Sequence, residues 1–455
     1  MRDRTCPGRS YTAPTNLAMN VPLPLRWLPR RAKDLLFRFL VPLVWAAAWV
    51  WRRALRGTVF IAVTGSVGKT TCKDLLAAAL ATRFRVVKSR GTANSQAMIA
   101  RSLLAVRPWH RFAVLEVATG FTGQMRPAAR RLRPDIAVVL AIARTHIDKF
   151  GSLDAIAADK AELVAALAPG GLAVLNGDDP RVAVMGKDRP LRTVFFGSAP
   201  GSQLAASEVT ARFPARLSLC ASDGQSTVVV RTRLVGTQWT PSVLAALLVA
   251  RECGVPLADA AAAFTSEEPM VARLKPVLLP SGAVLLRDEY NSSIDSLRVA
   301  LAVLREASAG RRVLVISDYS DLQESYRGRF RLLPSLVAGA VDDVVLVGEH
   351  AEYGRRRLLE AGFPAERIAV AQGLEATAEL LRAHTGPGDL VLLRGRATDH
   401  ISRAAIVQFG SIRCWKPRCT WTTICDECPV LGASRDVLRA AHAPWRASAD
   451  DGATS

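Results

Sequence analysis

Short apolar runs alternate with longer amphipathic stretches from about residue 58 onward. The first of these runs are TVFIAVTG, RFAVLEVA, PDIAVVLAIA and GGLAVLNGDD, and each has the length and composition of a buried strand. The stretch KTTCKDLLAAALATRF follows the first run directly and has the apolar spacing of a helix. Strands that alternate with helices predict a parallel, doubly wound sheet that binds ligands at the carboxyl ends of its strands.

The pattern changes twice further along the chain. Residues 192–235 alternate apolar and polar positions in the runs TVFFG, VTARFPARLSLCAS and STVVVRTRLVG, which predicts antiparallel strands. A second α/β block begins near Met270, with the strands AVLLRDEY, RRVLVISD, DDVVLVGE and GDLVLLRG. Periodicity stops after about Gly410. We therefore predict an α/β chain: a parallel-sheet domain with a small antiparallel β section, then a Rossmann-like domain, then a tail rich in cysteine.

Composition adds a strong positive charge to this picture. Of the 455 residues 50% are hydrophobic and 22% charged, which is typical of globular domains, and the formal net charge is +20. Such an excess fits nucleic acid, anionic lipid, acidic substrates or simply a GC-rich genome. No aromatic–basic alternation or recognition helix is found, so we expect no nucleic-acid partner.

The excess charge is concentrated at the N-terminus. Residues 1–57 hold eleven Lys and Arg against two Asp, a net +9. Within them lies the uncharged run FLVPLVWAAAWVW (39–51), which is shorter than the roughly 20 residues of a spanning helix. Its tryptophans Trp45, Trp49 and Trp51 and the flanking arginines suit an anionic membrane surface. An interfacial anchor is the first expectation, and a true span and a helix docked on the protein are the alternatives.

The stretch VTGSVGKTT (63–71) follows a predicted strand and opens a predicted helix. In that setting backbone N–H groups and the helix N-terminus face an anion, as in a phosphate loop. Lys69 would meet the β- and γ-phosphates and the Thr70 hydroxyl would bind Mg²⁺. The general motif has glycine where this chain has Val63. The predicted ATP-binding loop comprises Gly65, Ser66, Val67, Gly68, Lys69, Thr70 and Thr71.

Three more residues are candidates for the same edge of the sheet. Glu116 ends the run FAVLE, where a carboxylate is well placed to bind Mg²⁺. His146 follows the next strand and can ligate a second metal ion. Lys160 lies on the helix that begins after Ser152, and carbamylation by CO₂ would turn it into a carboxylate-like ligand. The alternative for Lys160 is an ion pair with Asp159 or Glu162 on a solvated helix.

From about Thr58 to Ile406 the chain resembles the Mur ligase family, the ATP-dependent amide ligases of cell-wall peptide assembly. The segments that carry the resemblance are TGSVGKTT, GTANSQ, LEVATGFTGQM, THIDKFGSLDAIAADKAEL, NGDDP, RDEYNSSIDSLRVAL and LVLLRG. The resemblance implies that ATP converts a substrate carboxylate to an acyl-phosphate, which an amine attacks to give an amide. The implied partners are a small-molecule or peptide carboxylate and an amine. The implied location is the cytoplasm, either free or associated with the inner face of the cell membrane.

The resemblance also assigns roles by position. It implies that Lys69 and Thr70 hold the phosphates and the first Mg²⁺, with Glu116 as a ligand, and that His146 and carbamylated Lys160 serve the second metal. Three further residues belong where the C-terminal domain closes over ATP: Arg273, Asp288 and Asn291. The resemblance divides the chain into a basic hydrophobic segment (1–57), the central ATP-binding domain (58–268), the C-terminal domain (269–410) and the cysteine-rich tail (411–455).

The chain departs from the family pattern in several places. The adenine-side segment HNxxN is replaced by residues 238–242 (QWTPS), which contain no asparagine. The pattern YNANP reads YNSSI from Tyr290, and Arg394 replaces the lysine of VLVKGS. The basic segment stands where the family has its UDP-sugar domain, so a UDP-muramoyl peptide is not the first expectation as donor. A non-catalytic nucleotide-binding partner protein is the alternative function.

Four of the eight cysteines are grouped in the tail, with the spacing C-x4-C-x5-C-x2-C. Such a group predicts a ligand set in a reduced compartment rather than a disulfide framework. Four thiolates can close a tetrahedral zinc site or hold an iron–sulfur cluster, and unligated thiols are the third alternative. The four residues are Cys414, Cys419, Cys425 and Cys428.

Overall fold

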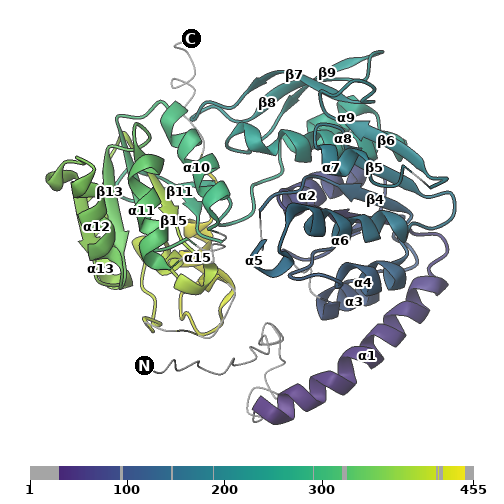
Figure 1. Ribbon diagram of the computed structural model, residues 1–455, viewed down its shortest axis with the longest axis horizontal. Helices are drawn as coiled ribbons and strands as arrows, with labels where there is room; N and C mark the ends of the chain where they lie inside the picture. The colour runs from purple at the N-terminus through teal and green to yellow at the C-terminus, as the bar shows by residue number, and fades with distance from the viewer. Residues whose placement is uncertain are drawn as a thin grey trace, which may run out of the picture.

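The computed structural model describes residues 30–92, 96–144, 147–187, 189–290, 292–319, 325–416, 419 and 424–445, with side chains from residue 41 onward except at Asp148. Two α/β units lie side by side, with the long first helix projecting from one of them (Figure 1). We call them the central unit and the C-terminal unit. The α/β class, the parallel sheet, the antiparallel section and the Rossmann-like second unit are confirmed.

The central unit is built on a six-stranded parallel sheet. Its strands, in spatial order, are β2 (Val86–Lys88), β3 (Phe112–Glu116), β1 (Val59–Thr64), β4 (Ile136–Val139), β5 (Leu172–Asn176) and β6 (Arg192–Phe196). The chain runs from β1 to β2 and β3 on one side of β1 and then crosses to β4, β5 and β6 on the other, so the loop after β1 lies at the switch point where ligands bind in such sheets.

Helices cover both faces of this sheet. They are α2 (Lys69–Ala81), α3 (Gln96–Ala105), α4 (Met125–Leu132), α5 (Ile147–Phe150), α6 (Leu153–Ala165), α7 (Pro180–Ala183), α8 (Thr240–Glu252) and α9 (Leu257–Phe264). Successive β1 residues serve the two faces: Ile61 packs with the core of α2 and α8, and Ala62 with the core of α3 and α4. Because both faces are covered at the centre of the sheet, the inner strands β3, β1, β4 and β5 are buried at every residue but Val59, which explains the continuous apolar runs.

A small antiparallel sheet packs beside α8 and α9, formed by β7 (Ala205–Thr210), β8 (Ser218–Ser222) and β9 (Thr227–Arg231). The run TVFFG was expected to belong to it, and that expectation is wrong. TVFFG lies in β6, which pairs parallel to β5 at the edge of the main sheet. At β6, an edge strand, one face of the sheet is covered more fully than the other. Buried Val194 and Phe196 therefore alternate with half-buried Thr193 and Phe195, as in an antiparallel strand.

The C-terminal unit has a second six-stranded sheet, which is parallel except for its first strand. In spatial order its strands are β10 (Lys275–Leu278), β11 (Val284–Asp288), β15 (Asp389–Arg394), β12 (Arg311–Ile316), β13 (Asp343–Val347) and β14 (Ile368–Ala371). Its helices are α10 (Ile294–Glu306), α11 (Tyr326–Val337), α12 (Ala351–Glu360), α13 (Leu374–His384) and α14 (Ser402–Ile406). The tail adds a short 3₁₀ turn, η7 (Cys425–Glu427), and a helix, α15 (Arg435–Ala441), which sequence periodicity did not predict.

Helix α1 (Arg30–Ala54) is docked on the central unit over its second half. Trp45 is buried there, and Trp51 Nε1 donates to the Val106 carbonyl at 2.9 Å. Arg52 pairs with Asp135 at 3.1 Å. Trp45 and Trp51 therefore pack against protein, contrary to the expected interfacial role, because the central unit offers them an apolar surface. No helix among the described residues is long and apolar enough to cross a membrane.

Candidate active site

The phosphate loop joins β1 to α2 at the switch point of the central sheet, and its backbone requires glycine. Gly65 and Gly68 have φ values of 146° and 82°, which L side chains rarely adopt. A Cβ on Gly68 would stand 2.4 Å from Ser242 Oγ, and that hydroxyl donates to the Gly68 carbonyl at 3.2 Å. Val63, the departure from the general motif, is a fully buried residue of β1. The position at which the general motif has glycine therefore lies in strand β1 and not in the loop, so its replacement by valine leaves the loop unchanged.

Thr70 and Glu116 lie together under this loop. The parallel register sets Val63 of β1 beside Glu116 of β3, so the end of β3 reaches the first turn of α2. Thr70 Oγ1 donates to Glu116 Oε2 at 2.7 Å, and both side chains are buried. A hydroxyl and a carboxylate at a phosphate loop are hard oxygen ligands of the kind that Mg²⁺ prefers, so the donor set fits this metal.

The Lys69 ammonium group lies inside the loop. Its Nζ donates to the Gly65 carbonyl at 2.9 Å and to the Ser66 carbonyl at 3.2 Å. Burial lowers the pKa of Lys69, the Glu116 carboxylate opposes that effect, and the Arg273 guanidinium adds to it. Three charged groups from two units thus act on one another at this position.

Lys160 is buried in α6 with 4% of its surface exposed. Among the described residues, Lys160 has no hydrogen-bond or ion-pair partner. Asp159 accepts instead from Thr119 Oγ1 at 2.6 Å and from the Gly123 N–H at 2.9 Å, and Glu162 pairs with Arg126 at 2.7 Å. The alternative of a solvated ion pair with either carboxylate therefore does not describe Lys160. Ser152 caps α6 as expected, accepting from the Ala155 N–H.

The pKa of Lys160 is lowered to about 7, first by burial and then by the charge of Lys69, while Asp159 raises it. At such a pKa much of the Lys160 side chain is a neutral amine near pH 7, and the neutral amine is the form that reacts with CO₂. The other expected member of this group, His146, lies outside the described residues.

The C-terminal unit contributes Arg273 to the same region. Burial lowers the pKa of Arg273, while Tyr290 and Glu116 raise it, so its guanidinium lies near the Glu116 carboxylate of the central unit. Arg273 also stacks over the Tyr290 ring, 4.7 Å from the centroid. The Tyr290 hydroxyl in turn lies 2.5 Å from Thr92 Oγ1, a residue of the GTANSQ segment.

Asp288 is engaged within its own unit. Its carboxylate pairs with Arg394, the residue that replaces the family lysine, and accepts from the Leu274 N–H at 3.2 Å. The Asp288 carboxylate is therefore engaged within the C-terminal unit, two residues before Tyr290. Asn291 lies outside the described residues.

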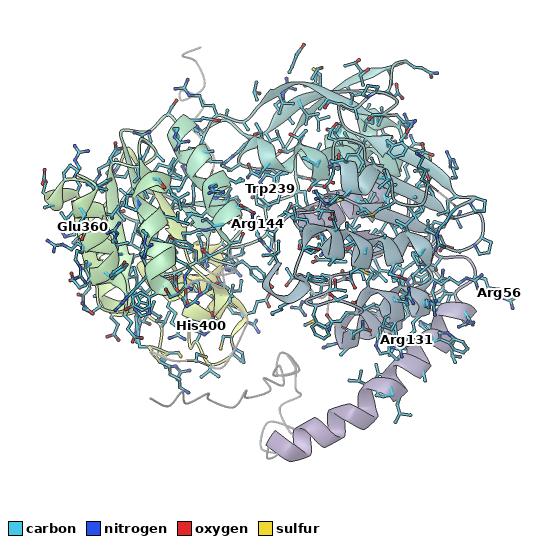
Figure 2. The ribbon with its side chains drawn as sticks, in the orientation of Figure 1. Arg56, Arg131, Arg144, Trp239, Glu360 and His400 are labelled. Atoms are coloured by element: carbon cyan, nitrogen blue, oxygen red, sulfur yellow. The ribbon has the colours of Figure 1, made fainter. Side chains whose placement is uncertain are left out.

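In the segment that replaces the adenine-side motif (238–242), side-chain donors form hydrogen bonds within the protein. Gln238 Nε2 and Trp239 Nε1 both donate to the Val235 carbonyl, at 2.9 and 3.0 Å. Figure 2 shows Trp239 and Arg144 between the two units. The indole N–H of Trp239 is therefore already engaged, and so is one of the two amide N–H groups of Gln238.

Sequence reasoning missed a second buried lysine. Lys73, one turn after Lys69 on α2, is fully buried, donates to the carbonyls of Ser89 and Gly91 at 2.8 and 2.7 Å, and pairs with Asp74 at 3.3 Å. It ties α2 to the start of the GTANSQ segment. The i, i+4 spacing indicated only that the two lysines share one face of α2.

All four tail cysteines line one cavity beside α14. Within the described part of the chain, no group of three or more His, Cys, Asp or Glu side chains is arranged to hold a single metal ion. The expected zinc site therefore finds no support in this geometry.

Two family models match the chain: the Mur ligase middle domain over residues 63–250, and the Mur ligase glutamate ligase domain over 272–397. A UDP-N-acetylmuramoyl-tripeptide–D-alanyl-D-alanine ligase of Mycobacterium tuberculosis is 32% identical over 361 residues, covering 74% of this chain and 70% of the relative. The corresponding Escherichia coli enzyme is 29% identical and covers 67% of each chain.

Solved structures share the fold. MurF from Acinetobacter baumannii superposes with a TM-score of 0.73 at 24% identity, covering 80% of this chain and 79% of that one. MurF from Thermotoga maritima in complex with ADP superposes at 0.66 with 21% identity, covering 78% and 80%. Together with the family models and the relative above 30% identity, these likenesses complete the case: the chain belongs to the Mur ligase family and is an ATP-dependent amide-bond ligase.

Proposed function

We propose that this ligase joins a carboxylate to an amine through an acyl-phosphate, using ATP and Mg²⁺. The γ-phosphoryl group passes to the carboxylate oxygen with release of ADP. The amine nitrogen then attacks the acyl carbon, and the tetrahedral intermediate expels phosphate as the nitrogen loses its proton. The observation that carries the proposal is the Thr70–Glu116 pair beneath a loop that also holds Lys69.

The charged residues of the site have distinct roles in neutralising the negative charge of the two substrates. A carboxylate and a γ-phosphate repel each other, and cations placed between them lower the barrier to phosphoryl transfer. Thr70 and Glu116 would hold Mg²⁺, which neutralises the charge that develops on the phosphate oxygens. Lys69 would bind the phosphates from inside the loop, and Arg273 would reach the same region from the C-terminal unit.

We propose that Lys160 is carbamylated. Its neutral amine adds to CO₂, forming an N–C bond and releasing one proton, and the product is a carbamate anion. Two cations a few ångströms apart repel by about 4 kcal/mol at an effective dielectric constant near 20, whereas a carbamate near a divalent ion is attracted. The lowered pKa and the lack of a partner among the described residues support this role.

The donor substrate is proposed to be a peptide, amino acid or cell-envelope precursor that bears a free carboxylate. ATP would be held mainly by its phosphates, because the Trp239 indole N–H and one Gln238 amide N–H donate to Val235 and the segment contains no asparagine. Phosphate release should be assayed over a panel of peptide and lipid-linked carboxylates, with D-alanyl-D-alanine and single amino acids as amines. ATP and GTP should be compared in each case. Nucleotide binding without turnover on any pair would favour the non-catalytic alternative.

We further propose that the enzyme works in the cytoplasm at the inner membrane face. One side of α1 packs on the central unit, but Leu43 and Val50 are 65% and 60% exposed on the other side, with Trp49 beside them. Arginines lie near this apolar side, and Arg53 stacks on Trp49 at 3.4 Å. An exposed apolar strip flanked by cations suits anionic lipid.

The membrane proposal is tested by flotation with vesicles of phosphatidylglycerol and phosphatidylcholine. The Leu43→Ser/Val50→Ser variant should lose binding, whereas Val184→Ser, a change at an exposed valine elsewhere in the central unit, should not. Wild-type protein that stays unbound at low salt would reject the anchor.

For the tail cysteines we propose a structural metal group, separate from the ligase chemistry. Its support is the single cavity that all four side chains line.

A further inference from the structure

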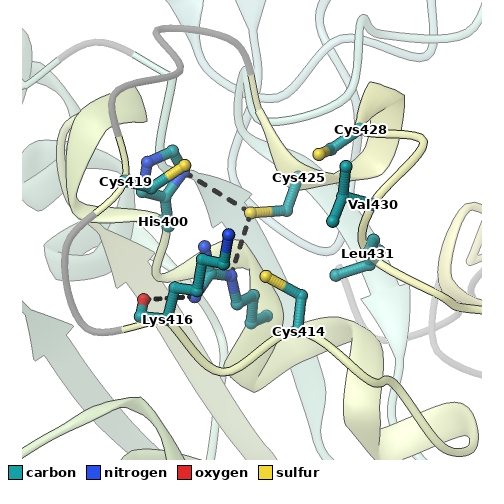
Figure 3. A pocket seen from close by; sticks show the side chains of 9 residues that line it. His400, Cys414, Lys416, Cys419, Cys425, Cys428, Val430 and Leu431 are labelled. Carbon is teal, nitrogen blue, oxygen red and sulfur yellow. Dashed lines mark hydrogen bonds between the residues drawn. The ribbon is translucent and has the colours of Figure 1, made fainter.

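The four tail cysteines converge on one cavity, with Cys425 and Cys428 at the two ends of η7 and Cys414 and Cys419 from the preceding part of the tail (Figure 3). The cavity has a volume of about 40 Å³, and a single buried water needs roughly 10–15 Å³ measured in the same way. Its other walls are His400, Arg403, Lys416, Val430 and Leu431. The thiols therefore surround a space larger than one atom, on the side of α14 that faces the tail.

The cavity has a positive wall that is not balanced by any carboxylate. Arg403 is 1% exposed, and its Nε donates to Cys425 Sγ at 3.2 Å while another guanidinium nitrogen donates to the Lys416 carbonyl at 2.7 Å. Within the described residues Arg403 has no acidic partner. A buried guanidinium is costly without a counter-charge, so the geometry favours an anionic group at the thiols. N–H donors to sulfur are also a usual means of tuning metal-bound thiolates.

The arrangement distinguishes between the two metal groups that four cysteines can hold. Zinc requires its sulfur ligands at about 2.3 Å from one centre, in a tight tetrahedron. No such group of three or more ligands exists among the described residues, although all four cysteines are described and none is in a disulfide. A four-iron cluster places each thiolate on a different iron at the corners of a larger body. We infer that this cavity holds a [4Fe–4S] cluster ligated by Cys414, Cys419, Cys425 and Cys428.

The cluster would hold a turn that is tied to β11 of the C-terminal unit and lies close to Gly91 of the central unit. Between two of its ligands lies Asp426, whose carboxylate accepts from the Arg287 guanidinium at 2.8 and 2.9 Å and lies 2.6 Å from His442 Nε2. Arg287 belongs to β11, the strand that leads to Tyr290 and its contact with Thr92. The next residue of the turn, Glu427, has a carboxylate oxygen 4.0 Å from where a Cβ on Gly91 would stand.

This position gives the cluster an effect on the ligase, and that part rests on the proposed function. With the cluster bound, η7 is fixed and Asp426 holds β11 in place. Without it, the turn keeps its backbone hydrogen bonds and the Asp426 contacts with Arg287 and His442. It loses the link through the cluster to the rest of the tail, so β11 is held less firmly. Occupancy of the cluster site would therefore affect how firmly Tyr290 and Arg273 of the C-terminal unit are held at the active site. No electron transfer is required for this effect.

The cluster itself is tested by metal analysis, independently of activity. Full-length protein purified without oxygen should contain about four iron and four sulfide per chain, show broad visible absorption, and give a reduced-cluster EPR signal with dithionite. Cys425→Ser and Cys428→Ser should lose iron and colour, whereas Cys220→Ser, in the small antiparallel sheet, should keep both. One zinc per chain without iron, or no metal at all, would overturn the inference.

The link to the strand is tested with Asp426→Asn. It should retain iron and sulfide and yet lower the thermal unfolding temperature of the C-terminal unit, in the same direction as Cys425→Ser. If the wild type contains the cluster and proves inactive on every substrate pair, the proposed function fails and the cluster stands. If cluster-free variants match the wild type in both unfolding temperature and amide formation, the supporting role is wrong.

Discussion

Two regions of buried positive charge in this molecule, the phosphate loop and the junction with the tail, differ in what balances the charge. Around the phosphate loop, Lys69, Lys160 and Arg273 come together with Glu116 close by, and burial lowers the pKa of all three cations. At the junction with the tail, Arg287 is bound by Glu289 and Asp426, which together raise its pKa above the ordinary value despite full burial. The first region has an excess of cations and suits an anionic substrate. The second is balanced and holds the fold.

The two lysines of the central unit show the same contrast at closer range. Lys73 satisfies its ammonium with two carbonyls and a carboxylate, as a structural lysine does. Lys160 is as deeply buried and has no such set within the described residues. An uncompensated buried cation reduces stability, so its presence indicates a function that outweighs that cost.

The largest effect is expected from removing the central cation of the first region. Lys69→Ala should lower phosphate release by about 10²–10³-fold or more, because a preorganised positive group on the transferring phosphate is lost. The measurement is single-turnover phosphate release at saturating ATP, with the exposed Lys187→Ala as the matched control. If Lys69→Ala kept activity within a few-fold of the control, the cations of the first region would not have the catalytic role proposed for them.

Lys160→Ala should lose most activity and regain part of it with added formate or acetate, which replace the carbamate. Lys160→Arg should show no rescue, since a guanidinium does not form a stable carbamate. Lys73→Ala serves as the contrast, because its loss should appear as lower stability that no carboxylate restores. Full activity in Lys160→Ala would mean that the two lysines do not differ in the way proposed.

In the second region the loss should be one of stability. Asp426→Asn removes one of the two carboxylates that bind Arg287. The loss should be smaller than the about 3–5 kcal/mol of a fully broken buried pair, because Glu289 still balances the guanidinium. Urea unfolding should show this, with Asp436→Asn as the control, since the side chain of Asp436 is 87% exposed in its pair with Arg439. Equal midpoints for the two variants would show that the junction is not stabilised by its charges.

The smallest effect concerns pH and CO₂. The Lys160 pKa of about 7 leaves the amine increasingly protonated as pH falls through 7, so carbamate and activity should both decline below that pH at limiting bicarbonate. The sign for stability is opposite to that of a paired lysine. Between about pH 7 and 10.5 the unfolded chain binds more protons than the folded one, so this group makes stability rise with pH there. Activity can be followed together with the carbamate signal in ¹³C NMR, and a profile insensitive to bicarbonate would contradict the proposal.

The contrast between edge and central strands marks one limit of sequence reasoning. TVFFG alternates because β6 is an edge strand of the parallel sheet, and the same alternation arises in antiparallel strands. The apolar run of α1 was ambiguous for a similar reason. Trp45 and Trp51 suit a membrane interface or a protein surface equally well, and only the packing of α1 on the central unit distinguishes the two.

Local chemistry by itself determined much of this protein. The apolar runs predicted β1, β3, β4 and β5, the glycines predicted the phosphate loop, and the motif predicted that Lys69, Thr70 and Glu116 would meet. Such features depend on short stretches and on the rule that parallel strands end at one edge. Tertiary structure alone decided that Asp159 turns to Thr119, so that Lys160 has no partner among the described residues, and that Asp426 reaches Arg287 from 139 positions away. Charge balance in a protein interior depends on which distant groups are brought within a few ångströms, and no local pattern encodes that distance.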